Sequence, residues 1–181
     1  MKQLEIFKEN IKFVHWGELY AGCKMKWITI SDVLDFCDKR LIHNVFEEDY
    51  IDLYLALEDS LYMFYTKLKE YIIKEGGEPI VKNEDESCDY GFDFIPPAYF
   101  RIWQLEFLLE IKNKSLTIEE KIEDVSFLFD AMNYPDKWRP FYFYNISPQK
   151  INATIADKYS SFLLYIQEEI AFFKTLGNVP D

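Results

Sequence analysis

The chain has 181 residues, with 20 Lys and Arg against 32 Asp and Glu, so its formal net charge is −12 at pH 7. A chain of this length can bury about 70% of its unfolded surface, and a hydrophobic content of 49% excludes a disordered protein. The negative charge disfavours binding to nucleic acid and favours a basic protein partner. We therefore expect a single domain that spans residues 1–181.

The residue types that most often carry chemistry are sparse. Cys23, Cys37 and Cys88 show no CxxC spacing, and His15 and His43 lack the i, i+4 arrangement that would bring metal ligands together. No glycine-rich phosphate loop or nucleophile motif is present. The sequence therefore predicts no enzyme, no metal site and no cofactor. No run of 18 apolar residues occurs, so we expect a cytoplasmic protein without a membrane segment.

Helical periodicity dominates the first half of the chain. It predicts a helix from Leu4 to about Tyr20 and a second one that Ser31 and Asp32 cap. A third helix is predicted from residues 47–49 to the glycines at 76–77, and at 1.5 Å per residue it would be about 39 Å long.

A long acidic segment follows at residues 76–97, which we expect to be an irregular loop. We expect four of its acids to be exposed and to capture a basic partner, namely Glu84, Asp85, Glu86 and Asp89. The alternative is a solvated loop that binds nothing.

Three more helices are predicted after this loop. The first begins at Pro96 and Pro97, and the second begins at a capping box of Thr117 and Glu120. The second ends before Pro135, and a long last helix runs from residues 147–148 to Gly177. The predicted fold class is thus all-α, a single-domain bundle of about six helices, two of them long.

The aromatic segment between residues 134 and 144 has two interpretations. It can be a rigid connector whose rings fill one end of the bundle. Alternatively, its Trp, Arg and Tyr side chains can be exposed anchors for a partner, because these residue types dominate interface energetics. The candidate anchors are Trp138, Arg139, Tyr142 and Tyr144.

Residues 128–135 (LFDAMNYP), followed by Phe141, Tyr144 and Pro148, resemble the C-terminal signature of a family of small acidic bacterial proteins of unknown function. Trp16, Gly22, Trp27, Asp32-Val33 and Trp103 extend the resemblance to most of residues 10–150. Proteins of this kind are discussed as candidate immunity proteins for bacterial toxins. The resemblance implies a neutralising partner role and supplies no site residues.

These observations predict a cytosolic binding protein, an immunity protein that occludes a basic bacterial toxin. Charge attraction would speed its association with a basic partner, and an aromatic patch would slow dissociation. The alternative is a structural or regulatory helical module that associates with itself through the aromatic surface. The sequence makes no prediction of the oligomeric state.

Overall fold

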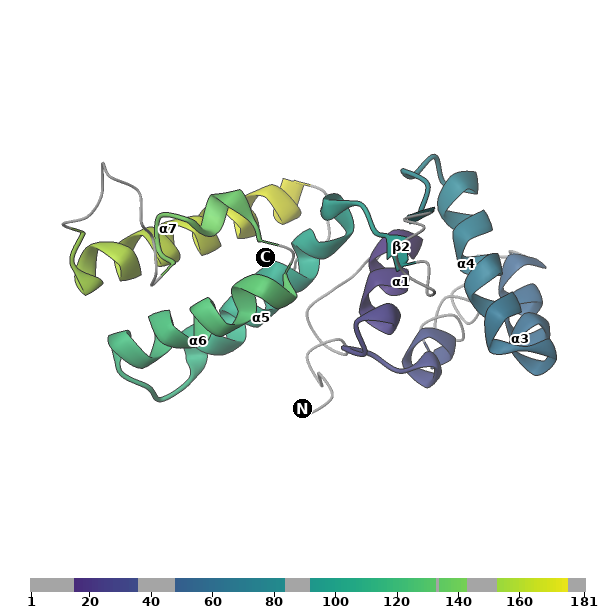
Figure 1. Ribbon diagram of the computed structural model, residues 1–181, viewed down its shortest axis with the longest axis horizontal. Coiled ribbons are helices and arrows are strands. Elements are labelled where there is room, and N and C mark those ends of the chain that lie inside the picture. The colour runs from purple at the N-terminus through teal and green to yellow at the C-terminus, as the bar shows by residue number, and fades with distance from the viewer. Residues whose placement is uncertain (1–14, 36–47, 84–91, 133, 143–152, 176–181) are drawn as a thin grey trace. The chain divides into compact units, whose positions relative to one another are not determined.

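The computed structural model describes residues 15–35, 48–83, 92–132, 134–142 and 153–175, and it is predominantly α-helical with one small sheet (Figure 1). The predicted all-α fold class is confirmed. Contacts within the chain cluster into two compact units, whose described residues fall within 15–99 and within 100–175. The single domain expected from the chain length stays a prediction.

The first unit is built on α4 (Leu61–Lys74), which packs against both α1 (Trp16–Lys24) and α3 (Glu48–Asp59). Figure 1 shows α3 and α4 side by side. Side chains from all three helices are fully enclosed, including Leu19, Leu53, Phe64 and Leu68. Apolar spacing had predicted a different buried stripe for α3 and α4. Leu68 and Ile72 of that stripe are buried, but Ile51, Leu55, Leu61 and Tyr62 are exposed, and Leu53 and Phe64 take their place in the core.

The predicted third helix is wrong in one respect, because it is divided into α3 and α4 at Ser60. Ser60 has an extended backbone, with φ −169° and ψ 157°, and its hydroxyl accepts a hydrogen bond from the N–H of Met63 at 3.2 Å. Serine favours such a cap because its side chain replaces a missing backbone acceptor. The apolar spacing continues across the break, which is why periodicity alone did not reveal it.

Two other helix starts in the first unit differ from the prediction. The helix α1 begins at Trp16, after an extended His15, although the sequence predicted a helix running through this position. The next helix begins at residue 30, where the Thr29 hydroxyl and the Asp32 carboxylate form a reciprocal cap. Asp32 therefore lies one turn inside the helix. Residues 4–14 of the predicted first helix are outside the described ranges.

The predicted irregular loop contains a short antiparallel hairpin. Strand β1 (Val81–Asn83) pairs with β2 (Phe92–Phe94), and Lys82 stands directly opposite Asp93. The acidic residues Glu84, Asp85, Glu86 and Asp89 lie outside the described residues. The hairpin matters for the site because it carries Asp93 to the helices of the first unit.

The second unit contains α5 (Arg101–Asn113), α6 (Ile118–Ala131) and α7 (Ile155–Thr175), and each of the three contacts the other two. A 3₁₀ turn, η2 (Pro97–Phe100), leads into α5. Every side chain of α5 from residue 102 to residue 108 is buried, the polar Gln104 and Glu106 included, which agrees with the central position that its largely apolar circumference predicts. A long last helix is present as the 21 residues of α7, but its predicted start at residues 147–148 is wrong. The helix begins at Ile155, where the Thr154 hydroxyl and the Asp157 carboxylate form the cap.

The predicted capping box at the start of α6 is confirmed. The Thr117 N–H donates to the Glu120 carboxylate at 2.8 Å, and the Glu120 N–H donates to the Thr117 hydroxyl at 3.3 Å. At the other end, α6 stops at Ala131, before Pro135. A 3₁₀ turn, η3 (Asp136–Trp138), then begins the aromatic segment.

Candidate functional site

A cavity of about 390 Å³ lies in the first unit, between α1, α4 and the hairpin. Three tyrosines line it, Tyr20 from α1 and Tyr62 and Tyr65 from α4. Lys24, Lys69 and Lys82 line it as well, one lysine from each of these elements. The cavity therefore combines aromatic rings with several positive charges in a chain that is strongly acidic overall.

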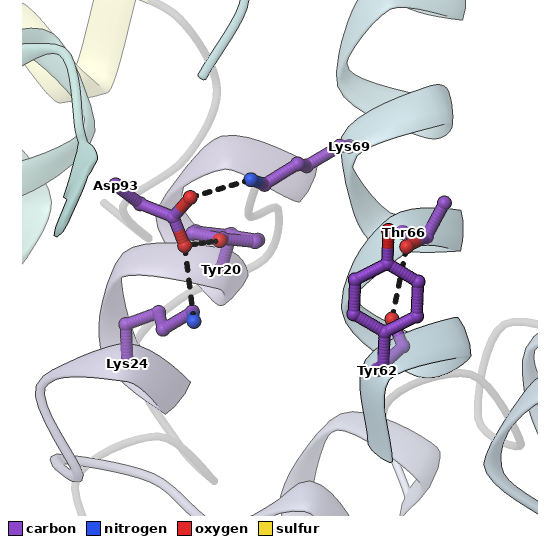
Figure 2. A network of polar contacts seen from close by, with 6 residues as sticks. All are labelled: Tyr20, Lys24, Tyr62, Thr66, Lys69 and Asp93. Carbon is purple, nitrogen blue, oxygen red and sulfur yellow. Dashed lines mark hydrogen bonds and ion pairs between the residues drawn. The ribbon is translucent and has the colours of Figure 1, made fainter. Parts of the chain in front are cut away.

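The carboxylate of Asp93 organises one wall of this cavity. Its Oδ2 accepts a hydrogen bond from the Tyr20 hydroxyl at 2.5 Å and lies 3.0 Å from the Lys24 ammonium. Its Oδ1 lies 2.6 Å from the ammonium of Lys69. Figure 2 shows this carboxylate between the two ammonium groups. Asp93 thus joins α1, α4 and β2 through charge-assisted hydrogen bonds.

The titration of Asp93 reflects this arrangement. Burial on its own would raise the pKa of Asp93, but the hydrogen bonds from Lys69, Tyr20 and Lys24 lower it to about 2. Burial raises the pKa of Tyr20 well above its ordinary value, and the hydrogen bond to Asp93 adds to this effect. Asp93 is therefore ionised and Tyr20 neutral across the physiological range.

Aromatic rings also hold the lysines in place. The Lys24 ammonium lies 4.3 Å from the centroid of the Tyr65 ring, and the Lys69 ammonium lies 5.6 Å from that of Tyr20. Such cation–π contacts favour an ammonium that is partly removed from water. Tyr62 projects from α4 near Thr66 (Figure 2). This tyrosine lines the cavity and is 69% exposed.

The sequence analysis missed this cavity. A local signal was present, because Tyr62, Tyr65 and Lys69 recur at helical spacing and Tyr20 and Lys24 are four residues apart. Asp93 gave no such signal, since it lies 73 residues from Tyr20 in the chain. Only the folded hairpin brings its carboxylate to the two helices.

The structure corrects the interpretation of Trp138 as an exposed anchor. Its side chain is completely buried, and it packs against Phe141, with ring centroids 6.1 Å apart. Phe141 in turn contacts Phe162 and Tyr165 of α7. This part of the aromatic segment is a rigid connector in the core of the second unit, because prolines 135 and 140 restrict the chain while its rings fill the space beside α7.

The remaining candidate anchors have different environments. Arg139 is exposed, and its Nε lies 2.9 Å from Oδ1 of Asp136. Tyr142 is half-buried and stacks on Phe129 at a centroid distance of 4.3 Å. Tyr144 lies outside the described residues. The sequence led us to expect at least one of Trp138 and Arg139 to be exposed, together with Tyr142 or Tyr144. The first part is confirmed by Arg139, whereas Tyr142 is only half-exposed.

Buried carboxylates occur in both units. In the first unit, burial raises the pKa of Glu18 to about 7, although a hydrogen bond from the His15 backbone opposes the shift. In the second unit, burial raises the pKa of Glu106 to about 7, and Glu169 is buried against Arg101 with an Nε to Oε2 distance of 2.5 Å. The contact between Glu169 and Arg101 joins α7 to α5.

A second notable surface lies on α3, and we call it the acidic–apolar surface of α3. It consists of two exposed apolar residues, Ile51 and Leu55, and three exposed acids, Asp52, Glu58 and Asp59. The whole helix carries five acidic residues and no basic one. Exposed apolar side chains among charges of one sign are typical of a contact surface for a partner of the opposite sign.

Neither a metal site nor a membrane span occurs in the part of the chain that the structure describes. In those ranges no three His, Cys, Asp or Glu side chains come together in a way that could hold a metal ion. Within the same ranges, every helix is too short or too polar to span a bilayer.

A family model described as "Uncharacterized protein conserved in bacteria (DUF2247)" matches residues 4–170. The chain belongs to the DUF2247 family. The match includes residues of both compact units. The family resemblance predicted from the sequence is confirmed. Neither a curated protein nor a solved structure matches the chain.

Proposed function

We propose that this member of DUF2247 is a binding protein of the bacterial cytoplasm, an immunity protein that neutralises a basic toxin by covering it. The observation that carries this proposal is the acidic–apolar surface of α3. Ile51 is 59% exposed and Leu55 is 56% exposed, and they are one helical turn apart on a helix whose charged residues are all acidic, with Lys67 of α4 4.0 Å from Asp52.

Charge determines which partners this surface favours. The chain carries −12 overall, and α3 alone contributes five acidic residues. A basic protein approaching α3 is attracted over a range of about one Debye length, about 8 Å at physiological ionic strength. Such steering raises association rates more than it raises affinity. Rapid capture is the property that an immunity protein needs, since the toxin must be bound before it acts.

The exposed apolar residues of α3 would slow the dissociation of the complex, which charge attraction alone does little to achieve. Desolvated apolar contacts slow the dissociation of a complex, and burial of an exposed leucine contributes about 1.5–3 kcal/mol. A second copy of this chain fits α3 poorly, because two surfaces of the same sign would face each other. The charge of the surface therefore favours a basic partner over the alternative of self-association.

The test begins with the reading frames that neighbour this gene. The proposal expects a secreted protein with a basic C-terminal domain among them. That domain is expressed in a bacterial host with and without the present chain, and growth is followed. We expect the domain to arrest growth and the chain to relieve the arrest.

A matched pair of variants assigns the effect to α3. Leu55→Lys changes a leucine that is 56% exposed on α3, and Leu164→Lys changes one that is 57% exposed on α7. We expect Leu55→Lys to abolish protection and Leu164→Lys to retain it. Equal protection by both variants would refute the role of α3. Absence of any basic toxin domain, or unrelieved arrest, would refute the immunity function.

Association kinetics with the purified toxin domain provide a second readout. The variant Glu58→Lys/Asp59→Lys should lower the association rate about tenfold at low salt, with a smaller difference at high salt. If the protein instead forms a stable dimer that Leu55→Lys dissociates, the immunity function is refuted in favour of the alternative, a helical module that associates with itself.

A further inference from the structure

A second binding function rests on the cavity beside Asp93 and is independent of the proposed toxin partner. We propose that this cavity binds a small organic anion that carries a planar apolar group, with its charged end at the lysines and its planar end at the tyrosines. The volume of about 390 Å³ lies within the range of about 300–1,000 Å³ that is common for small-molecule sites.

The charge of the lining is opposite to that of the chain. Three lysines and one aspartate line the cavity, so its formal charge is 3 − 1 = +2, whereas the whole chain carries −12. A positive cavity in an acidic protein attracts a small anion locally while the remaining surface repels large polyanions. This contrast selects small anionic ligands over nucleic acid.

Asp93 does not use up the hydrogen-bonding capacity of the lysines. Lys24 and Lys69 each contact one of its carboxylate oxygens, at 3.0 and 2.6 Å. An ammonium group has three N–H donors, so each lysine keeps donors for a ligand. Asp93 acts as a positioning residue, because it fixes two ammonium groups at the cavity wall before any ligand arrives. A preformed site loses less conformational entropy on binding.

Lys82 supplies the third positive charge. It stands directly opposite Asp93 in the hairpin, and residues in this relation project from the same face of the two strands. Among the described residues no carboxylate pairs with Lys82, although it lines the cavity. Its ammonium group is therefore the most accessible contact for an incoming oxyanion.

The tyrosines are the reason that we expect a planar apolar group at the uncharged end of the ligand. Tyr62 is 69% exposed at the cavity, and the Tyr65 ring lies beneath the Lys24 ammonium. Aromatic rings at a site favour a planar apolar group that can pack against them. Carboxylates and phosphates are both oxyanions that lysine binds, so the experiment compares a ligand with a carboxylate and a ligand with a phosphate.

The experiment is a titration of the full chain, followed by isothermal calorimetry and by amide chemical shifts in NMR spectra. The probes are benzoate, phenyl phosphate, inorganic phosphate and benzylamine. We expect at least one of the two aromatic anions to bind, about tenfold more tightly than inorganic phosphate because of the buried ring. The tighter of the two identifies a carboxylate or a phosphate ligand. Benzylamine, which carries the ring and the opposite charge, should not bind.

Variants then separate the two halves of the site. Lys82→Gln should weaken binding of the aromatic anion about fivefold, as expected for one partly exposed charge, whereas Lys174→Gln on α7 should not change it. Tyr62→Ala should weaken the aromatic anion and leave inorganic phosphate unaffected. Both Lys82 and Tyr62 are exposed, so circular dichroism should show unchanged folding.

Three results would overturn the inference. They are no binding of either aromatic anion, binding of benzylamine as tight as that of the anions, and an affinity that Lys82→Gln leaves intact. None of these results involves the toxin, so the cavity and the immunity function can fail separately.

Discussion

The buried carboxyl of Glu106 should make the protein less stable as the pH rises from 4.5 to 7. Only 5% of this residue is exposed, and burial raises its pKa from 4.5 to about 7. The folded chain therefore holds this proton more tightly than the unfolded chain does. Below pH 4.5 both states are protonated, and no stability is lost. Between 4.5 and 7 the unfolded state alone ionises, so the free energy of unfolding falls.

The size of this loss follows from the two pKa values. They differ by about 2.5, and each pKa unit corresponds to about 1.4 kcal/mol, so the loss above pH 7 is about 3 kcal/mol. This is a large part of the 5–15 kcal/mol that is typical for a whole domain. Replacement of Glu106 by glutamine should remove the loss, because an amide of nearly the same shape does not ionise.

The assay is urea denaturation of the native chain and the Glu106→Gln variant at pH 4, 5, 6, 7 and 8. We expect the stability of the variant relative to the native chain to rise by about 3 kcal/mol between pH 4 and pH 8. Glu18 titrates in the same direction, but it is present in both proteins and cancels in the difference.

A control on the same helix completes the test. Glu110 is an exposed glutamate of α5, so Glu110→Gln makes the same chemical change on the same helix without removing a buried carboxyl, and its stability relative to the native chain is measured at the same pH values. If the difference for Glu106→Gln were independent of pH, the reasoning from burial would be refuted, and Glu106 would have to ionise as readily in the folded chain as in the unfolded one.

Three further predictions concern the connector, the helix break and the loop. Trp138→Ala should lower the free energy of unfolding in urea by about 3–5 kcal/mol because it leaves a cavity, while Arg139→Ala, at an exposed position, should cost less than about 1 kcal/mol. Ser60→Ala should cost about 1 kcal/mol through loss of the helix cap, and a change within the error of urea denaturation would show that the cap contributes nothing. The four loop acids to be replaced by their amides are Glu84, Asp85, Glu86 and Asp89. This replacement should leave the melting temperature nearly unchanged and should slow association with a basic toxin domain in stopped-flow measurements. Unchanged association kinetics would mean that the loop is a solvated segment that does not capture the partner.

Local features of the sequence determined the helical class and most of the helices. Apolar spacing predicted α4, α5, α6 and α7, because helical periodicity is a property of residues three and four positions apart. The capping box of Thr117 and Glu120 could also be recognised in the sequence, since both partners lie within one helical turn. These features depend on short-range contacts, which a sequence displays directly.

Other local features were ambiguous because two arrangements satisfied the same pattern. Ser60 can lie within a helix or cap one, and the apolar spacing was the same in both cases. Thr29 and Ser31 are both good caps, and the structure uses Thr29, whose hydroxyl bonds the N–H of Asp32. The choice between such neighbours depends on how the helix packs, which a local pattern does not contain.

Only the tertiary structure decided the environments of Trp138 and Asp93. Trp138 and Arg139 are neighbours in sequence, but one is enclosed beside Phe141 and the other faces solvent. Asp93 is one of many acids in its segment, and it becomes distinct only when the hairpin places it against Tyr20, Lys24 and Lys69. Burial and ion pairing depend on residues far apart in the chain, so the sequence supplied the side chains, and folding alone determined which of them meet.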